Sequence, residues 1–327
     1  MVMALSDLGF ADLAVECVSP GQGRSPASGP SQMGGCGKVI GRFKRFSGDL
    51  RLELVPDACQ GDLVALQAAL ADNPANVTRY RMEWQGMKLR VQRRDTPNGP
   101  VWILRRIASV LLLLDQLGIP SPIVQKLRRP ELRGGLLLFA GGPGAGKSTA
   151  ACAVIVDRLE TIGGFTWTAE NPVEYDLQGP HGAGQCYQEE INEDLEIQRV
   201  LMDTLRSSAD TFFIGEIREE TSARAACLAA ASGMLVLSTL HADSAQQALL
   251  KIGMLAGMDG LSQSLRGIIT MRMDRELSAA NGPQRVLKVQ PFFVEDESLR
   301  QKIAKGDMAA INMDLETQRN RFLMGAR

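Results

Sequence analysis

The second part of the chain alternates apolar runs, each long enough for one strand, with stretches whose apolar residues recur at helical spacing. Continuous apolar runs are typical of parallel strands, which need helical crossovers to connect them. Residues 131–327 are therefore predicted to form an α/β domain with a mostly parallel sheet between helices. The predicted strands are 136–140, 165–168, 211–215, 234–239 and 286–293, and the predicted helices are 146–159, 195–206, 219–231, 244–255 and 299–304.

The region from residue 38 to 107 shows a different pattern, with short alternating strands around a single helix. Asn98-Gly99 lies between two of the strands and indicates a hairpin turn. This pattern predicts a separate small α+β domain. Its predicted strands are 39–46, 50–55, 78–84, 88–93 and 101–107, and its predicted helix is 61–71.

Two further segments carry weaker patterns. Residues 1–37 begin with a possible short helix or strand at 4–18 and continue into a stretch rich in Gly, Ser and Pro, so we expect a flexible N-terminal segment. Residues 108–130 contain three prolines and two short apolar stretches, 110–117 and 123–127. They are predicted to be a helical linker between the two domains.

Composition narrows the class of protein. The 327 residues are 45% hydrophobic with a net charge of −1, which gives no reason to expect nucleic acid as a direct partner. Residues 38–106 carry thirteen Lys and Arg against seven Asp and Glu. We interpret this excess as a solvated surface or an interface with an acidic neighbour, and a binding face for a polyanion is the alternative. No apolar run is long enough to cross a membrane, no leader pattern opens the chain, and the six cysteines suggest no disulfide framework. A cytoplasmic location is expected.

A glycine-rich motif follows the first strand of the α/β domain and has the spacing G-x-x-x-x-G-K-[ST]. In a strand-to-helix turn, converging backbone N–H groups and a helix N-terminus bind phosphate, and the lysine adds a positive charge. The motif therefore predicts a site for ATP, with Mg²⁺ bound by the hydroxyl of Ser148. Its residues are Gly141, Gly142, Pro143, Gly144, Ala145, Gly146, Lys147, Ser148 and Thr149.

Three side chains that suit catalysis follow other strands of the same domain. Glu216 ends one apolar strand, Glu170 follows another, and His241 comes directly after a third. Parallel strands bring their carboxyl ends to one edge of the sheet, where ligands bind. We interpret Glu216 as a water-activating base or an acid that orders Mg²⁺, Glu170 as a catalytic neighbour and His241 as a sensor of the γ-phosphate. Each residue also has a purely structural interpretation. Glu216 could cap the next helix, Glu170 could belong to an Asn-Pro turn, and His241 could be a hydrogen-bonded histidine at a strand end.

These motifs together resemble the secretion ATPases of type II secretion and type IV pili, the GspE/PilT superfamily, and in particular its short PilT-like members. The phosphate loop is followed by Glu170-Asn171-Pro172-Val173-Glu174-Tyr175, by Gly215-Glu216 at the end of a strand, and by a segment ending in His241. The resemblance covers about residues 80–305. It implies a hexameric ATPase with a PAS-like N-terminal domain and a RecA-like C-terminal domain.

The resemblance also implies roles for single residues. Glu216 would polarise the attacking water and Glu170 would order Mg²⁺ or the water, and the reverse assignment stays open. Arg90 and Arg105 match arginines of the N-terminal domain that approach the phosphates of a nucleotide, and Arg218 matches a position that would pair between subunits. A peripheral association with the inner membrane, through a platform protein of the pilus or secretion machine, is implied as well.

Some positions depart from the family pattern. Asn171 stands where Asp is usual, and Gln188 stands where the family tends to have arginine. The C-terminal residues 298–303 match a motif of retraction motors only in part. No four-cysteine zinc motif appears, which argues against the larger extension and type II secretion members, so pilus retraction is expected over extension. Two other functions remain open: a P-loop phosphotransferase that acts on a small molecule, and a nucleotide-binding assembly protein with little turnover.

Overall fold

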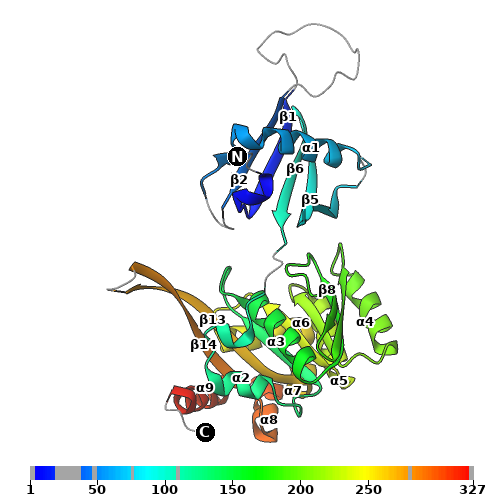
Figure 1. The fold of residues 1–327 in the computed structure, drawn as a ribbon. Helices are drawn as coiled ribbons and strands as arrows, with labels where there is room; N and C mark the ends of the chain where they lie inside the picture. The colour runs from blue at the N-terminus through cyan, green and yellow to red at the C-terminus, as the bar shows by residue number, and fades with distance from the viewer. Residues whose placement is uncertain are drawn as a thin grey trace. The chain divides into compact units, whose positions relative to one another are not determined.

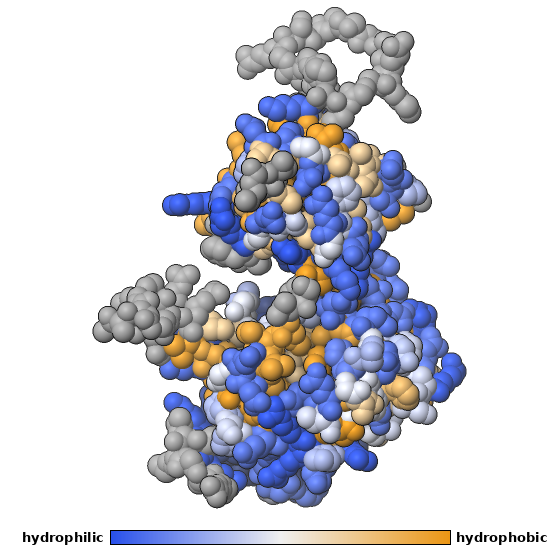
Figure 2. Space-filling view, in the orientation of Figure 1, coloured by the Kyte–Doolittle hydropathy of each residue, from blue (hydrophilic) through white to orange (hydrophobic). Residues whose placement is uncertain are grey.

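The computed structural model describes residues 4–18, 38–45, 50–74, 77–107, 111–278 and 282–323. The chain divides into two units, Met1–Ser109 and Val110–Arg327 (Figure 1). Hydrophilic residues cover most of the visible surface of each unit (Figure 2). Among the helices in the described ranges, none is long and apolar enough to cross a membrane.

The N-terminal unit is a six-stranded antiparallel sheet in the order β3-β2-β1-β6-β5-β4. Helix α1 packs on one face, where its Leu63, Leu66 and Leu70 are buried. Gly41 of β2 lets this helix approach the sheet, because a Cβ there would lie 2.9 Å from Leu63. The elements are η1 (Leu5–Leu8), β1 (Asp12–Val18), β2 (Lys38–Lys44), β3 (Glu53–Leu54), η2 (Asp57–Cys59), α1 (Gln60–Ala71), β4 (Arg79–Trp84), β5 (Met87–Thr96) and β6 (Gly99–Arg106).

The structure corrects the predicted flexible segment 1–37 for its described part, residues 4–18. Strand β1 lies inside the sheet between β2 and β6, and its Leu13 and Val15 are fully buried. Only these two large apolar side chains face the core, so the alternation was too short to separate a strand from a helix. Residues 19–37 lie outside the described residues. Cys17 is disulfide-bonded, although the cysteines suggested no disulfide framework in the sequence.

The C-terminal unit is built on an eight-stranded sheet in the order β14-β13-β7-β12-β11-β8-β10-β9, parallel except at its two outer strands. Helices α2 and α3 share one core with one face of the sheet, and α4 to α9 share the other. The strands are β7 (Gly135–Ala140), β8 (Gly164–Glu170), β9 (Gly179–His181), β10 (Gly184–Glu190), β11 (Thr211–Glu216), β12 (Leu235–Leu240), β13 (Leu265–Ser278) and β14 (Gly282–Phe293). The helices are η3 (Leu114–Gln116), α2 (Ser121–Leu127), α3 (Lys147–Thr161), α4 (Glu196–Arg206), α5 (Glu220–Ala231), α6 (Ala245–Ala256), α7 (Met258–Ser264), α8 (Glu297–Lys305) and α9 (Met308–Leu323).

This architecture confirms the predicted fold class, a mostly parallel α/β domain preceded by a small α+β domain. The predicted linker 108–130 is wrong for its described part, because Leu114, Ile123 and Leu127 are buried in the core of the C-terminal unit. The predicted helix 110–117 is reduced to the short turn η3. Strands β9 and β10 and helix α9 were not predicted.

Candidate nucleotide-binding site

The phosphate-loop motif connects the end of β7 to the start of α3. Gly144 and Gly146 have φ angles of 71° and 88°, in the left-handed region that favours glycine. A Cβ on Gly141 would lie 2.3 Å from the carbonyl oxygen of Met271 in the neighbouring strand β13. The loop can therefore take this path only with glycine at these positions.

Lys147 lies folded into the loop. Its side chain is almost fully buried, and its ammonium donates hydrogen bonds to the carbonyls of Gly141 and Gly142 at 3.0 and 2.9 Å. Nδ1 of His241 lies 3.5 Å from the same ammonium. Burial lowers the pKa of Lys147, while the negative charge of Glu216 opposes this effect. The lysine charge is thus held where a phosphate bound by the loop would sit.

Glu216 is the centre of a chain of polar contacts at the end of β11. Its Oε1 lies 3.2 Å from Nε2 of His241, and its Oε2 accepts a hydrogen bond of 2.7 Å from Nε of Arg218. The register of β11 against β12 shifts between Ile214 and Glu216, which marks a β-bulge or a similar irregularity at Gly215. Bulges commonly re-aim a side chain, and this one lies immediately before the carboxylate that meets His241.

Glu170 ends the neighbouring strand β8 and is only 2% exposed. Its Oε1 accepts hydrogen bonds from Oγ1 of Thr168 at 2.7 Å and from Nε2 of Gln188 at 2.9 Å. A Cβ on Gly215 would lie 3.4 Å from Cα and 3.5 Å from Cγ of Glu170, so the two positions are in direct contact. Gly215 therefore leaves room for Glu170 to pack against the end of β11.

Gln188 and Tyr175 support this part of the site, and the sequence did not reveal either role. Besides Glu170, Gln188 donates to the carbonyl of Tyr175 at 3.0 Å and accepts from the N–H of Leu177 at 2.6 Å. The hydroxyl of Tyr175 lies 2.7 Å from Oγ1 of Thr149 at the start of α3. These contacts join the segment after β8 to the phosphate loop, and nothing in the spacing of the residues indicates them.

Asp194, just before α4, is a second residue that sequence reasoning missed. Its Oδ2 is buried and has no hydrogen-bond partner within the described part of the chain. It lines a small cavity together with Asn171, Glu216 and Arg218. Burial raises the pKa of Asp194, and the positive charge of Arg218 acts in the opposite direction. Several acidic residues lie near position 194 in the sequence, so nothing in the sequence distinguished Asp194 from its neighbours.

Arg90 and Arg105 lie in the N-terminal unit, whereas the phosphate loop lies in the C-terminal unit. They are direct cross-strand neighbours on β5 and β6. Their face is opposite to the one covered by α1, because the alternate residues Leu89, Val91 and Leu104 are buried in the core. Arg105 forms an ion pair of 2.6 Å with Asp12 on β1, a contact that the sequence did not indicate.

Mg²⁺ fits the oxygen donors at the loop. Ser148 stands in the first turn of α3 beside Lys147, and Glu170 is a buried carboxylate at the same edge of the sheet. The described residues contain no group of three or more side chains that would bind a metal by themselves. Mg²⁺ usually keeps several waters and takes one or two protein oxygens plus substrate phosphates, so this donor set suits it when a nucleotide is bound.

The C-terminal unit is a P-loop nucleotide-binding domain of the RecA type. Its defining features are a buried strand, a glycine loop with a lysine, a following helix, and a carboxylate at the end of a nearby parallel strand. The chain belongs to the type II/IV secretion system protein family, whose sequence profile matches residues 76–321.

Similar proteins agree with this assignment. The chain is 33% identical over 229 residues to the type II secretion system protein E of Dickeya dadantii (strain 3937), covering 68% of this chain and 43% of that protein. It is 30% identical over 240 residues to the twitching motility protein of Neisseria gonorrhoeae, covering 70% of this chain and 61% of that protein. The crystal structure of the pilus retraction motor PilT with bound ADP superposes with a TM-score of 0.74 at 21% identity, over 97% of this chain and 90% of that chain. The last similarity concerns the fold alone.

Proposed function

We propose that this chain hydrolyses ATP with Mg²⁺ as one subunit of a hexameric motor of a type IV pilus or a related type II/IV secretion or conjugation machine. The observation that carries this proposal is the position of His241, whose ring contacts both Glu216 and Lys147. A phosphate on the lysine and a water on the carboxylate would then be held by one connected set of groups. That is the arrangement that phosphoryl transfer to water needs.

The different solvent exposure of Glu216 and Glu170 supports different roles for the two carboxylates. The side chain of Glu216 is 18% exposed, so a water molecule can reach it, and it is the better general base. Glu170 is 2% exposed and already accepts bonds from Thr168 and Gln188. It suits the ordering of Mg²⁺ together with Ser148. Bound Mg²⁺ would neutralise charge on the β- and γ-phosphates.

Arg90 and Arg105 suit a role in assembly. Guanidinium groups stabilise the charge that develops on a transferred phosphoryl group. Arg105 is exposed and its ion pair with Asp12 lies at the surface, so a nucleotide phosphate can displace it at small cost. If these arginines complete the site of a neighbouring subunit, the rate per chain depends on ring formation. The motor would act in the cytoplasm through a platform protein of the inner membrane, and retraction is favoured over extension.

One observation favours a second function, a nucleotide-binding assembly protein with little turnover. Arg218 donates a hydrogen bond of 2.7 Å to Oε2 of Glu216, so this oxygen is already engaged and is less available to an attacking water. Hydrolysis requires that this carboxylate binds the attacking water, so a permanent Arg218 contact would slow it.

The test is ATP hydrolysis measured across a series of protein concentrations, with molar mass from light scattering at every point. We expect the rate per chain to rise with assembly and to require Mg²⁺. Glu216→Gln should lower kcat about 10²-fold or more, as loss of a general base does. Glu220→Gln, on the exposed first turn of α5, is the matched control.

The N-terminal arginines are tested in the same assay. Arg105→Ala should lower the rate of the assembled protein only, while Arg106→Ala, the next residue on β6, should leave it unchanged. ADP formation that needs an added acceptor, with the phosphoryl group transferred to that acceptor, would instead indicate a phosphotransferase. A negligible rate that Glu216→Gln does not change would indicate the assembly protein and overturn the motor proposal.

A further inference from the structure

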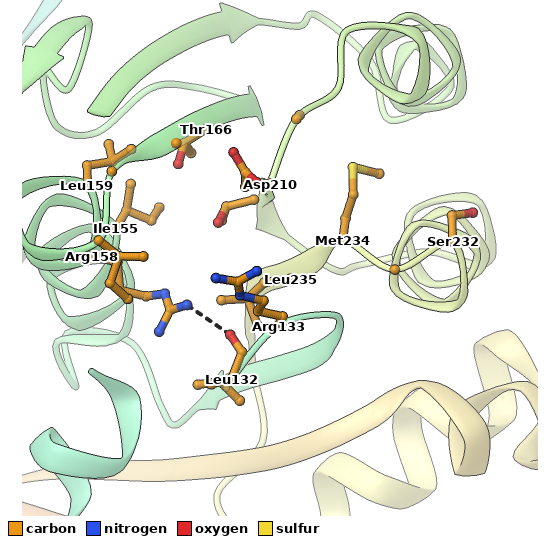
Figure 3. Close-up of a pocket in the computed structure, with 16 residues that line it drawn as sticks. Leu132, Arg133, Ile155, Arg158, Leu159, Thr166, Asp210, Ser232, Met234 and Leu235 are labelled. Atoms are coloured by element: carbon orange, nitrogen blue, oxygen red, sulfur yellow. Dashed lines mark hydrogen bonds between the residues drawn. The ribbon is translucent and has the colours of Figure 1, made fainter. Parts of the chain in front are cut away.

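A cavity of about 360 Å³ lies at the edge of the C-terminal sheet opposite to the phosphate loop. It is lined where β8, β11 and β12 begin and where α3 ends (Figure 3). Its inner wall is apolar, formed by the buried side chains of Ile155, Leu159 and Leu235. A volume of this size is within the range of pockets that bind small molecules.

Two arginines face this cavity. Arg158, near the end of α3, is 8% exposed, and Arg133 lies on the exposed rim (Figure 3). The guanidinium of Arg158 is fixed by hydrogen bonds to the carbonyls of Leu127 at 2.7 Å and Leu132 at 2.8 Å. Its position therefore does not depend on a ligand.

Neither arginine of the cavity has an anionic partner. Among the described residues, Arg133 and Arg158 form no ion pair with a carboxylate. Asp157, beside Arg158 in the sequence, forms an ion pair with Arg128 instead. Burial lowers the pKa of Arg158, the negative charge of Asp157 opposes this effect, and the positive charge of Arg133 adds to it. Arg158 is buried and Arg133 is exposed at the rim, so the cavity has positive charge on its wall and at its opening, which suits the binding of an anion.

The opposite side of the cavity carries a carboxylate and a hydroxyl, from Asp210 and Thr166 (Figure 3). Oδ2 of Asp210 accepts a hydrogen bond of 2.8 Å from the N–H of Phe165. Gly164 has a φ angle of 89°, and a Cβ on it would lie 2.4 Å from Oδ2 of Asp210. The glycine makes room for the carboxylate, so this wall is also shaped before any ligand binds.

We propose that this cavity binds a small phosphate monoester that carries an amine or hydroxyl group at its other end. Two guanidinium groups match the two charges of a phosphate monoester. Arg133 can form paired hydrogen bonds with it through its terminal nitrogens. Arg158 adds its charge, because its terminal nitrogens already donate to three backbone carbonyls. The amine or hydroxyl faces Asp210 and Thr166, and the body of the ligand packs on the apolar wall. The site is separate from the phosphate loop and does not depend on ATP hydrolysis.

The fold gives this site a physical connection to the nucleotide site. Helix α3 begins with Lys147 at the phosphate loop and has Arg158 in its last turn. Strands β8 and β11 begin at the cavity and end at Glu170 and Glu216. A ligand that orders the cavity therefore orders elements that also carry the nucleotide-site residues.

The experiment uses the full chain with its phosphate loop saturated by ADP and Mg²⁺, titrated with phenyl phosphate and with 4-aminophenyl phosphate by calorimetry and ligand-observed NMR. We expect saturable binding in the millimolar range or below, which is usual for molecules of this size. The amino compound should bind more tightly, because its amine reaches Asp210. Inorganic phosphate should compete with both.

Three variants test whether the probes bind in this cavity. Arg133→Ala removes a rim side chain with one hydrogen bond, to the carbonyl of Pro130, so it should fold normally and weaken both probes about tenfold or more. Arg129→Ala, four residues earlier and outside the cavity, is the control. Asp210→Asn keeps an oxygen for the N–H of Phe165 and should abolish only the preference for the amino compound.

Two results would overturn the proposal. The first is the absence of saturable binding of either probe up to roughly 20 mM, well above the affinity of a fragment that fits its pocket. The second is binding that Arg133→Ala leaves as strong as in the wild type, because the probe would then occupy some other site.

Discussion

The ring of His241 lies between two groups of opposite charge, with Nε2 3.2 Å from Oε1 of Glu216 and Nδ1 3.5 Å from Nζ of Lys147. A neutral imidazole has one donor and one acceptor nitrogen, so it can donate to the carboxylate and accept from the ammonium at the same time. The contact joins the end of β11 to the phosphate loop through a residue that directly follows β12.

We expect His241→Ala to lower kcat for ATP hydrolysis by about 10- to 100-fold, because a hydrogen bond to a charged group contributes about 1.5–3 kcal/mol. ADP binding should change little. His181→Ala is the matched control, since the chain has only these two histidines and His181 bonds a backbone carbonyl in the β9 segment. Equal losses in the two variants would contradict the role given to His241.

A second prediction concerns two adjacent glycines. Gly141→Ala should destabilise the protein by about 1–3 kcal/mol and weaken ADP binding, because the added Cβ would lie 2.3 Å from the backbone of Met271. Gly142→Ala should have a much smaller effect on stability, since its nearest neighbour, Asp243, lies 3.6 Å from the added atom. Thermal unfolding and ADP titration of both variants test this difference. Similar stabilities would show that the loop can shift away from β13.

Gln188→Leu should lower the free energy of unfolding by about 2–4 kcal/mol. The substitution removes hydrogen bonds to Glu170, Tyr175 and Leu177, each worth about 0.5–1.5 kcal/mol, and leaves buried groups unpaired. Chemical denaturation measures the change. Gln185→Leu, on the same strand with a single long contact of 3.5 Å, is the control and should cost much less.

Asp194 makes stability depend on pH. Burial raises its native pKa above 3.8, so the native state binds this proton more tightly than the unfolded state does. The stability contributed by this group is therefore present at low pH and is lost as pH rises through the native pKa. Asp194→Asn lacks this loss, so it should unfold at a higher temperature than the wild type at pH 7, and the difference should shrink toward pH 4.

The control for this pH series is Asp203→Asn on α4, whose side chain is 62% exposed. It should show no gain in unfolding temperature at pH 7. A difference between the wild type and Asp194→Asn that is constant across pH would mean that shape rather than charge sets the effect.

Local sequence patterns were enough to predict the central strands and the phosphate loop. The run 136–140 is wholly apolar, and β7 is buried along its whole length. The G-x-x-x-x-G-K-[ST] spacing is a local property, because one loop and one helix end supply all the groups that bind phosphate. The carboxyl ends of parallel strands share one edge, so Glu170, Glu216 and His241 were expected near each other before any contact was known.

Contacts between distant segments were not predictable in this way. Strand β1 has a weak pattern of its own and exists because β2 and β6 pair with it from both sides. The bonds of Gln188 to Glu170 and Tyr175 depend on β10 lying beside β8, a pairing that no single segment encodes.

The sequence by itself determined that this protein has a phosphate loop in an α/β domain of the secretion ATPase type, since strand, glycines and lysine are adjacent in the chain. The tertiary structure decided which side chain meets which. His241 reaches Glu216 because β12 lies beside β11, and Arg133, Arg158 and Asp210 share a cavity because three separate segments meet at the other edge of the sheet. Sheet order and register arise from packing summed over the whole domain, so they appear only when the chain is folded.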